Sequence, residues 1–529
     1  MPESVDAVII GAGPNGLVAA NLLADQGWEV LVLEAEDEPG GAVRSTTAIE
    51  PGFVVDLFSA FYPLGVASPV ITELVLERHG LRWTHAPAVL AHPTPDGPSA
   101  VLSRDLGATA TSLDRFAAGD GAAWAELMAR WAQVEEPLLA AALRPMPPLR
   151  PAASLVRRLG ARGTADLARL ALLPVRRLAE EHFGGEGAAL LLAGNALHTD
   201  LGPESTASGI FGLLLAGIGQ RHGWPVPVGG AGRLTDALVA RLVAGGGSVR
   251  CGARVDAVEV RAGRATGVRV VDGSAVTARR AVIADVVAPQ LYGWLLRGVP
   301  MPGRVAADLA RYQPGAATFK VNWALDRPVP WADPEVGSAG TVHLADSVDE
   351  LSRTTVEIAT GALPSRPFLL IGQMTTADAT RSPAGTESLW AYTHVPQQVR
   401  GDAGGDGLTG RWDAAESERF ADRVQARIEQ YAPGFGACVR SRHLQSPTDL
   451  QHADANLIGG DTNLGTAQLH QQAIFRPTTG WARPETFVDR LYLGSASAHP
   501  GGGVHGACGA NAARAALWAH RRGRWRGER

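Results

Sequence analysis

A set of glycines near the start of the chain has the spacing of a dinucleotide-binding turn. Gly11, Gly13 and Gly16 follow the apolar run 8–10, and Glu34 ends a second apolar run. Gly11 permits a tight turn, Gly13 lets the backbone approach a pyrophosphate, and Gly16 lets a helix pack on the strand. Glu34 can accept hydrogen bonds from ribose hydroxyls, and its charge disfavours a 2′-phosphate. The motif therefore predicts a nucleotide of the NAD or FAD kind rather than NADP.

The segments around these glycines agree with that prediction. Residues 8–10 and 29–34 have the composition of short buried strands, and residues 17–26 have that of a connecting helix. Pro14 and Asn15 precede this helix, whose N-terminus attracts phosphate oxygens. The alternative is a glycine turn in an α/β domain that binds no nucleotide. Since strand, helix, strand and acid are all present, the dinucleotide site is the better interpretation.

A second glycine-rich turn lies near the other end of the sequence. Residues 490–493 have the pattern of a strand, residues 501–503 are all glycine, and small residues line the helix that follows. The N-terminus of that helix could face the same ligand as the first. FAD needs two such positive ends, one for its pyrophosphate and one for charge on the reduced flavin. NAD alone does not, so the two turns together favour FAD.

One lysine stands out among the basic residues. The chain has 48 lysines and arginines, and all but Lys320 are arginine. In the run 318–325, Lys320 and Asn322 alternate with Phe319, Val321, Trp323 and Leu325, as expected of a strand. A compact ammonium with a tunable pKa does what an arginine cannot. Lys320 is therefore a catalytic candidate, and the alternatives are a solvent-facing lysine or chance.

Three histidines are weaker candidates for proton transfer. His499 and His505 flank the C-terminal glycines, and His470 precedes the run Ile474-Phe475-Arg476-Pro477. A histidine beside a flavin can act as an acid or a base. We favour a structural hydrogen bond for His499, and take His505 and His470 as catalytic candidates. The three cysteines lack the spacing of metal ligands, so no metal site is predicted.

Composition limits the class of protein and its partners. Hydrophobic residues make up 46% of the 529 residues and charged residues 19%, which is typical of a globular enzyme. The net charge of −5 argues against nucleic acid as a partner. Few cysteines and no room for a signal peptide before the first strand predict a cytoplasmic protein that binds a small molecule. The protein could form a homodimer.

One basic segment could contact a membrane. Residues 144–177 contain one acid, Asp166, and leucines interleaved with eight arginines: Arg144, Arg150, Arg157, Arg158, Arg162, Arg169, Arg176 and Arg177. Such a surface could bind anionic lipids peripherally. The alternative is the solvated face of a helical lid. The most apolar stretch, residues 207–219, is too short to span a bilayer.

The motifs together resemble the phytoene dehydrogenase (carotenoid desaturase) family of flavoproteins. The resemblance rests on the N-terminal glycines, the Gly40-Gly41 turn, the loop 229–233 and the His-Pro-Gly-Gly-Gly run at 499–503. It is strongest to the pyridine nucleotide-disulphide oxidoreductase domain branch. It implies FAD, with Val255 at the adenine and the turn 41–44, including Ala42 and Arg44, beside the pyrophosphate and flavin. Ser495, Gly503 and Val504 are assigned to the cofactor as well.

Two residues depart from the pattern of that family. Ala42 stands where wider relatives often have a basic residue, and Ser495-Ala496 stands where many have Gly-Asp. Some contacts to the flavin side must therefore be made by other residues. By the same resemblance, Lys320 is similar to the amine-oxidase lysine that holds a water at flavin N5.

The expected architecture is α/β, with a discontinuous Rossmann-like FAD-binding domain as in monoamine oxidases. Its pieces are residues 1–100, 223–300 and 481–529, with a helical lid at 101–222 and an inserted α+β substrate domain at 301–480. The expected function is hydride transfer from a substrate C–H bond to flavin N5, and the resemblance implies a lipophilic substrate. The alternatives are a double-bond isomerase without net redox change and a flavin-bearing binding or scaffold protein.

Overall fold

The N-terminal glycine motif connects to a seven-stranded sheet. The computed structural model describes residues 3–95, 97–480 and 482–525. The strand order is β10 (Val255–Arg261), β11 (Arg264–Val270), β12 (Ala275–Ala284), β1 (Glu3–Ile10), β2 (Val30–Leu33) and β9 (Ser248–Arg250), with β20 (Leu491–Leu493) also paired to β12. Strands β20, β12, β1, β2 and β9 run parallel. The apolar runs of β1, β2 and β20 are buried, as parallel strands covered by helices require, whereas β9 at the edge is largely exposed.

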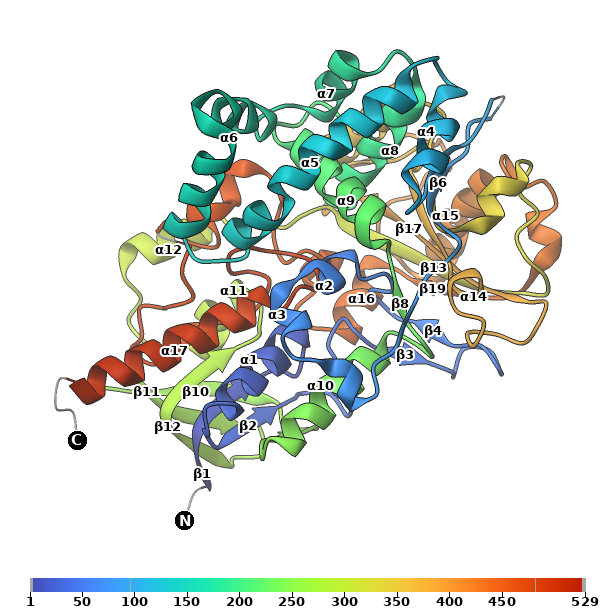
Figure 1. Ribbon diagram of the computed structural model, residues 1–529. Helices are drawn as coiled ribbons and strands as arrows, with labels where there is room; N and C mark the ends of the chain where they lie inside the picture. The colour runs from blue at the N-terminus through green and yellow to red at the C-terminus, as the bar shows by residue number, and fades with distance from the viewer. Residues whose placement is uncertain (1–2, 96, 481, 526–529) are drawn as a thin grey trace.

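Two helices from opposite ends of the chain lie side by side on this sheet (Figure 1). They are α1 (Pro14–Ala24) and α17 (Ala507–Trp525), and α10 (Gly232–Ala244) packs against α1. A Cβ atom at Gly509 would lie 1.9 Å from the carbonyl oxygen of Asn15, so only glycine permits this approach. The two helix N-termini are thereby brought together, as the two glycine turns predict.

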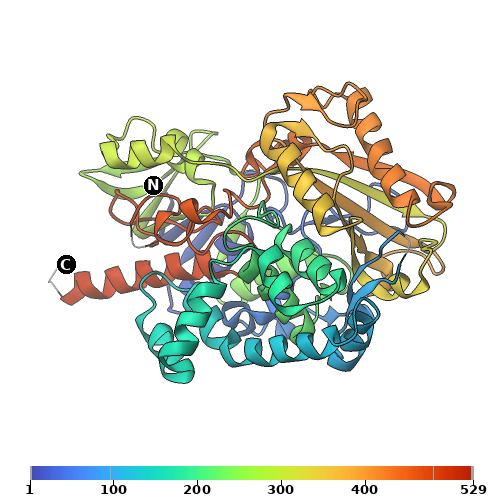
Figure 2. The same ribbon diagram turned by 90° about the horizontal axis from the view of Figure 1, so that it is seen from above.

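A second seven-stranded sheet carries Lys320. Its order is β19 (Val439–Gln445), β13 (Ala317–Leu325), β17 (Glu387–Val395), β16 (Leu369–Gln373), β14 (Ala339–Leu344), β6 (Ala88–His92) and β7 (Ala100–Leu102). Only the pairing of β14 with β6 is parallel among these strands. The predicted alternation in β13 is confirmed, because Phe319, Val321, Trp323 and Leu325 all belong to one apolar core. Figure 2 shows the two sheets next to each other.

A layer of helices covers the space beside both sheets (Figures 1 and 2). It contains α4 (Leu106–Asp114), α5 (Asp120–Ala142), α6 (Leu149–Leu170), α7 (Val175–His182), α8 (Glu186–Ala196) and α9 (Ser208–His222). The lid is therefore helical, as predicted. Two of its helices, α6 and α7, are separated by the short segment 171–174. The chain breaks before α7 because Pro174 occupies its N-cap and cannot continue a helix.

One stretch of the predicted first cofactor piece, residues 88–100, belongs to the second sheet. The remaining helices and strands lie between or beside these parts. They include β3 (Ser45–Thr46), β4 (Val55–Asp56), α2 (Pro63–Ala67), α3 (Pro69–Thr72), β5 (Trp83–Thr84), β8 (Val226–Pro227), α11 (Ala288–Gln290), α12 (Gly303–Ala310), α13 (Val348–Thr360), β15 (Ala362–Leu363), α14 (Met374–Ala377), β18 (Gly401–Asp402), α15 (Ala414–Glu429) and α16 (Pro447–Ala453).

Candidate active site

A cavity of about 640 Å³ runs between the two sheets and the helical layer. One part is lined by the N-terminal glycine turn, the end of β2 and the start of β10. Another part is lined by β13, β17 and the helices α5 and α9. Of the predicted site residues, those that line it are Gly11, Gly13, Pro14, Asn15, Glu34, Gly41, Ala42, Arg44, Val255, Lys320, Gly503, Val504 and His505. Most of the predicted site residues therefore line one cavity.

The N-terminal glycines keep the backbone close to the end of β12. A Cβ atom at Gly11 would lie 2.8 Å from the carbonyl oxygen of Asp285, and one at Gly13 would lie 2.7 Å from its Oδ2. Gly16 does not line the cavity. Its Cβ would lie 2.3 Å from the carbonyl oxygen of Gly11, which confirms a packing role. A side chain at any of these three positions would clash with its neighbours, so the turn requires glycine there, as the motif predicts.

Asp285 is a member of the site that sequence reasoning missed. Its Oδ2 accepts a hydrogen bond of 2.7 Å from the Gly16 N–H, in the first turn of α1. Burial raises the pKa of this carboxyl group to about 8, and the nearby Asp454 and Glu34 add to the shift. Its position at the carboxyl end of a parallel strand was the signal that could have identified it.

Glu34 occupies the expected place at the end of β2. Its side chain is 8% exposed and lines the cavity. Its Oε2 accepts a hydrogen bond of 2.7 Å from Ala12 N–H, and its Oε1 accepts one of 3.0 Å from Glu36 N–H. The carboxylate therefore orders the glycine turn while it faces the region where a ribose would lie.

The Gly40-Gly41 turn packs against the N-terminal glycine turn. Gly40 N–H donates to the Ala12 carbonyl, and a Cβ atom at Gly41 would lie 3.2 Å from the Cα of Gly13. Gly40 itself does not line the cavity, whereas Gly41 and Arg44 do. The guanidinium of Arg44 donates to the Gly41 carbonyl at 2.9 Å and the Ala453 carbonyl at 2.6 Å. This arginine thus fixes a positive charge beside the two turns.

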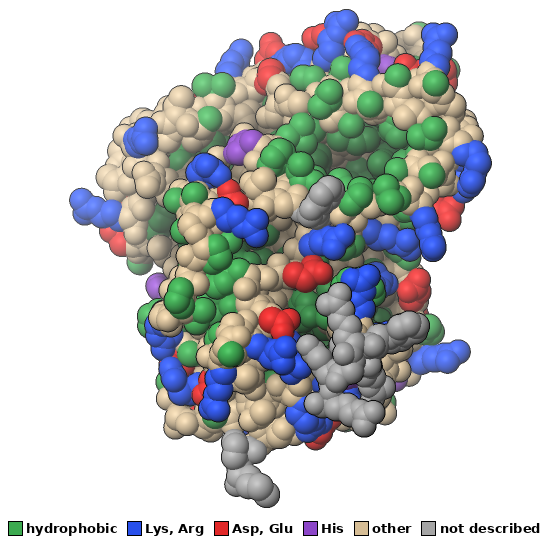
Figure 3. All heavy atoms as spheres, turned by 90° about the vertical axis from the view of Figure 1, so that its left-hand side faces the viewer, with side chains coloured by type: hydrophobic (Ala, Val, Ile, Leu, Met, Phe, Trp, Pro, Cys, Tyr) green, Lys and Arg blue, Asp and Glu red, His purple; other side chains and the backbone are tan. Residues whose placement is uncertain are grey.

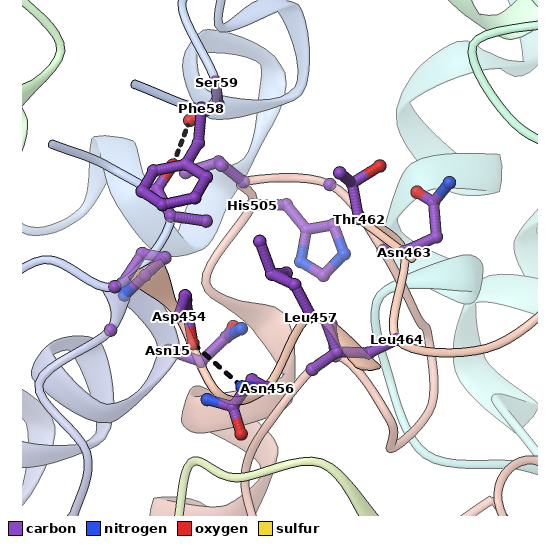
Figure 4. A pocket seen from close by; sticks show the side chains of 18 of the residues that line it. Asn15, Phe58, Ser59, Asp454, Asn456, Leu457, Thr462, Asn463, Leu464 and His505 are labelled. Atoms are coloured by element: carbon purple, nitrogen blue, oxygen red, sulfur yellow. Dashed lines mark hydrogen bonds between the residues drawn. The ribbon is translucent and has the colours of Figure 1, made fainter. Parts of the chain in front are cut away.

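Figure 4 shows His505, from the C-terminal turn, beside Leu457 and Thr462 in the lining of the cavity. Its Nδ1 accepts a hydrogen bond of 3.0 Å from Ala507 N–H at the start of α17, so the proton of the neutral ring sits on Nε2. Burial lowers the pKa of His505 to about 4. The ring caps a helix and faces the cavity, and a catalytic role for it stays a prediction.

Three of the predicted or considered residues lie away from the cavity. His470 is exposed, and its Nε2 lies 3.2 Å from the Gln313 side-chain oxygen, so the prediction of a pocket histidine there is not supported. Ser495 is fully buried and accepts a hydrogen bond from Ser497 N–H, which is a turn contact. His499 bonds the Arg144 carbonyl at 2.9 Å, in the structural role we favour.

Lys320 lies inside the protein. Its side chain is 3% exposed, lines the cavity, and donates to the main-chain carbonyls of Asp56 and Phe58. Its ammonium lies 5.7 Å from the ring centroid of Trp390. Burial lowers the pKa of Lys320 to about 7, against an opposing effect of Asp56. A solvent-facing lysine is therefore excluded, and the amine can carry or release a proton near neutral pH.

The remaining walls of the cavity are mainly apolar. They come from α5 and α9 and from the segment before α2, and they include Leu138, Leu139, Ile210, Phe211, Leu214 and Phe61. His198, Tyr392 and Thr341 add polar groups that the sequence did not single out. Because these residues come from distant segments, no local pattern could have identified them. The cavity thus pairs a polar, glycine-lined part with an apolar part.

The polar part fits the ADP and flavin portions of FAD. The N-terminal turn and the Gly40-Gly41 turn bring backbone without side chains to the cavity. The N-termini of α1 and α17 lie close together there. Asn15 Oδ1 is buried and has no protein partner within the described chain, so a ligand group can satisfy it. Among the described residues, no group of histidine, cysteine or acidic side chains is arranged to hold a metal ion.

Several arginines of the basic segment 144–177 form ion pairs with acids that lie outside the segment. Arg169 pairs with Glu181 at 2.5 Å, and Arg176 pairs with Glu204 at 2.7 Å. Leu149 and Val156 of α6 are 72% and 50% exposed. Figure 3 shows hydrophobic side chains gathered in a hollow on this side of the molecule, with basic groups nearby. No helix within the described ranges is long and apolar enough to cross a membrane.

Comparison with known proteins agrees with this geometry. Residues 15–517 match the family model of flavin containing amine oxidoreductases. The chain is 31% identical to the pyridine nucleotide-disulfide oxidoreductase domain-containing protein 2 of Rattus norvegicus, over 96% of this chain and 92% of that protein. It is 25% identical to a neurosporene-forming phytoene desaturase of Rhodobacter capsulatus, over 94% and 91% of the two chains. The predicted resemblance is therefore confirmed.

Solved structures confirm the predicted architecture. An oxidoreductase from Methanosarcina mazei matches with a TM-score of 0.63 at 16% identity, covering 97% of this chain and 99% of that one. Putrescine oxidase with bound putrescine matches with a TM-score of 0.61 at 18% identity, covering 98% and 99%. These likenesses concern the fold, and the family supplies the cofactor, FAD. The chain belongs to the flavin containing amine oxidoreductase family.

Proposed function

We propose that this flavoprotein oxidises a largely apolar small molecule by removing a hydride from one of its C–H bonds. One observation carries the proposal. The glycine turns that suit FAD and the apolar walls of α5 and α9 line the same cavity, and Lys320 opens onto it as well. A substrate held by those walls would lie in the same enclosed space as the cofactor.

When bound, FAD supplies an acceptor for a hydride, which carries two electrons. The substrate loses that hydride from carbon and a proton from the adjacent atom, and a double bond forms between the two atoms. The electrons then leave to an external acceptor such as oxygen or a quinone. The chain's own residues bind and orient the substrate and exclude water, because the apolar walls offer no competing hydrogen bonds.

Lys320 is the group best suited to take up the proton. A base for this purpose works best when its pKa lies near the working pH, and burial lowers that of Lys320 to about 7. The carbonyls of Asp56 and Phe58 fix the position of its nitrogen. An arginine at this position would stay charged and could not accept a proton.

Anaerobic mixing with candidate substrates tests the proposal. The panel contains isoprenoid hydrocarbons, long-chain alcohols and primary amines, and the flavin absorbance and the products are followed. Lasting bleaching of the flavin by one class, with a dehydrogenated product, is the expected result. Isomerised substrate with an unchanged final flavin spectrum would make the protein an isomerase. No change with any class would favour a binding or scaffold protein.

A further inference from the structure

A row of side chains crosses the second sheet on the face that meets the cavity. Cross-strand pairing aligns Lys320 with Tyr392, Tyr392 with Leu370, and Leu370 with His343. Side chains at paired positions point to the same face of a sheet. Lys320 and Tyr392 line the cavity, and His343 lies behind His198, which lines it too. Lys320 and Tyr392, together with His198 in front of His343, therefore bring polar groups to the apolar part of the cavity.

His198 and His343 share a hydrogen bond between their Nε2 atoms at 2.9 Å. Burial lowers the pKa of His198 to about 3 and that of His343 well below its ordinary value, so both rings are neutral. One Nε2 must therefore donate and the other must accept.

The direction of this bond follows from the second nitrogen of His343. Nδ1 of His343 is buried and has no partner within the described chain. An unpaired lone pair is tolerated better than an unpaired N–H, so the proton of His343 sits on Nε2. His343 then donates to Nε2 of His198, which leaves the proton of His198 on Nδ1. The ring that lines the cavity thus carries an N–H donor.

Two hydroxyl groups accompany that donor. Thr341 lies two residues before His343 on β14, is 1% exposed and lines the cavity, and its Oγ1 has no partner in the described residues. Tyr392 also lines the cavity, and burial raises the pKa of its hydroxyl, which stays neutral. A buried hydroxyl without a partner costs free energy that a ligand hydrogen bond recovers.

The charges around the cavity narrow the chemistry of the ligand. Among the described residues, every acid that lines it belongs to the dinucleotide part, and these acids are Glu34, Glu36, Glu38, Asp285 and Asp454. An ammonium near His198 would find only neutral polar partners among the described residues, with no acid to balance its charge in this part of the cavity. A pure hydrocarbon would leave the His198 N–H and the Thr341 hydroxyl unpaired. A neutral oxygen atom suits both groups.

We infer that the substrate carries a hydroxyl or carbonyl oxygen that His198 and Thr341 bind, on an otherwise apolar body held by α5 and α9. The inference rests on the proposed function and adds the polar group of the substrate. It separates this site from one built for amines or for hydrocarbons.

Ligand titrations of the FAD-loaded protein test the inference. The probes are 1-decanol, decane and decylamine, and each Kd is measured from the perturbation of the flavin absorption spectrum. We expect 1-decanol to bind about tenfold more tightly than either of the other probes. Equal affinities for 1-decanol and decane, or no perturbation by any probe, would overturn the inference.

Two variants locate the effect. Thr341→Val removes a hydroxyl that has no protein partner, so the fold is expected to persist while the preference for 1-decanol falls to about threefold or less. His198→Phe removes the N–H and is expected to act in the same direction. Thr360→Val, an exposed hydroxyl bonded within its own helix, serves as the control. An unchanged preference in Thr341→Val would contradict the inference, whereas a protein that holds no FAD would contradict the proposed function instead.

Discussion

Arg381 and Asp56 form an ion pair of 2.8 Å in which both side chains are fully buried. Asp56 also accepts hydrogen bonds from the Ser45 hydroxyl at 2.6 Å and the Ala231 N–H at 2.8 Å. Its main-chain carbonyl receives the ammonium of Lys320. The ion pair therefore fixes the segment around Asp56, whose carbonyl positions the amine of Lys320. Arg381 itself does not line the cavity.

Arg381→Met is expected to destabilise the protein by about 3–5 kcal/mol, because Asp56 and Asp378 would be left buried without their partner. Urea unfolding of the two proteins measures the loss. Arg233→Met breaks an exposed pair with Asp236 and is expected to change the stability by less than about 1 kcal/mol. Similar losses in both variants would show that the buried pair is not special.

Gly13→Ala is expected to abolish tight FAD binding. The added Cβ atom would lie 2.7 Å from Oδ2 of Asp285, so the turn must open or the carboxyl group must give up its hydrogen bond to Gly16 N–H, and either change disturbs the place for a pyrophosphate. Flavin fluorescence during titration of the apoprotein gives the affinity. Gly303→Ala, where a Cβ atom meets open space at the start of α12, should bind FAD like the parent protein. Retained affinity in Gly13→Ala would argue against this FAD site.

Asp285→Asn is expected to flatten part of the pH dependence of apoprotein stability. The ordinary pKa of an aspartate is about 4, and burial raises that of Asp285 to about 8. Between these values the folded chain keeps a proton that the unfolded chain has released, so the contribution of Asp285 to stability falls as the pH rises. Urea unfolding from pH 4 to 8 should show a smaller decline in the variant. Parallel curves for both proteins would contradict the shift.

We propose that the arginines of α6 that lack ion pairs in the described chain bind anionic membranes. Replacing Arg150, Arg157 and Arg162 by glutamine should reduce sedimentation with phosphatidylserine vesicles about tenfold or more, since each basic residue near the surface contributes about 1 kcal/mol. Replacing Arg169, Arg176 and Arg177, which pair with acids, should have a smaller effect. If the parent protein does not sediment with these vesicles, the proposal is wrong.

Much of the dinucleotide part could be predicted because its signals are local. The order strand, glycine turn, helix and strand is a continuous pattern, so β1, α1, β2 and the role of Gly11 follow from the sequence. The alternation in β13 identified the face of Lys320 for the same reason. The C-terminal turn needed one further inference, that its helix N-terminus meets the first, and the close contact of Gly509 with Asn15 explains why it does.

The apolar part could not be predicted in the same way. His198, Thr341 and Tyr392 come from three distant segments, and only the folded sheet and the helix α8 before His198 bring them together. His470 looked like a pocket residue from its neighbours in sequence, yet its short turn points it to solvent. Residues 88–102 form a hairpin that joins the second sheet through a parallel pairing with β14, and no local pattern indicated this distant partner.

The central claim is that the one lysine of the chain lies buried beside the cofactor, and NMR of that lysine tests it most directly. Protein with labelled lysine Nζ and Cε should give one side-chain signal, which Lys320→Met removes. We predict that this signal titrates near pH 7 in the apoprotein and shifts when FAD is added. A titration near the ordinary lysine value of about 10.4, with no response to FAD, would contradict the account.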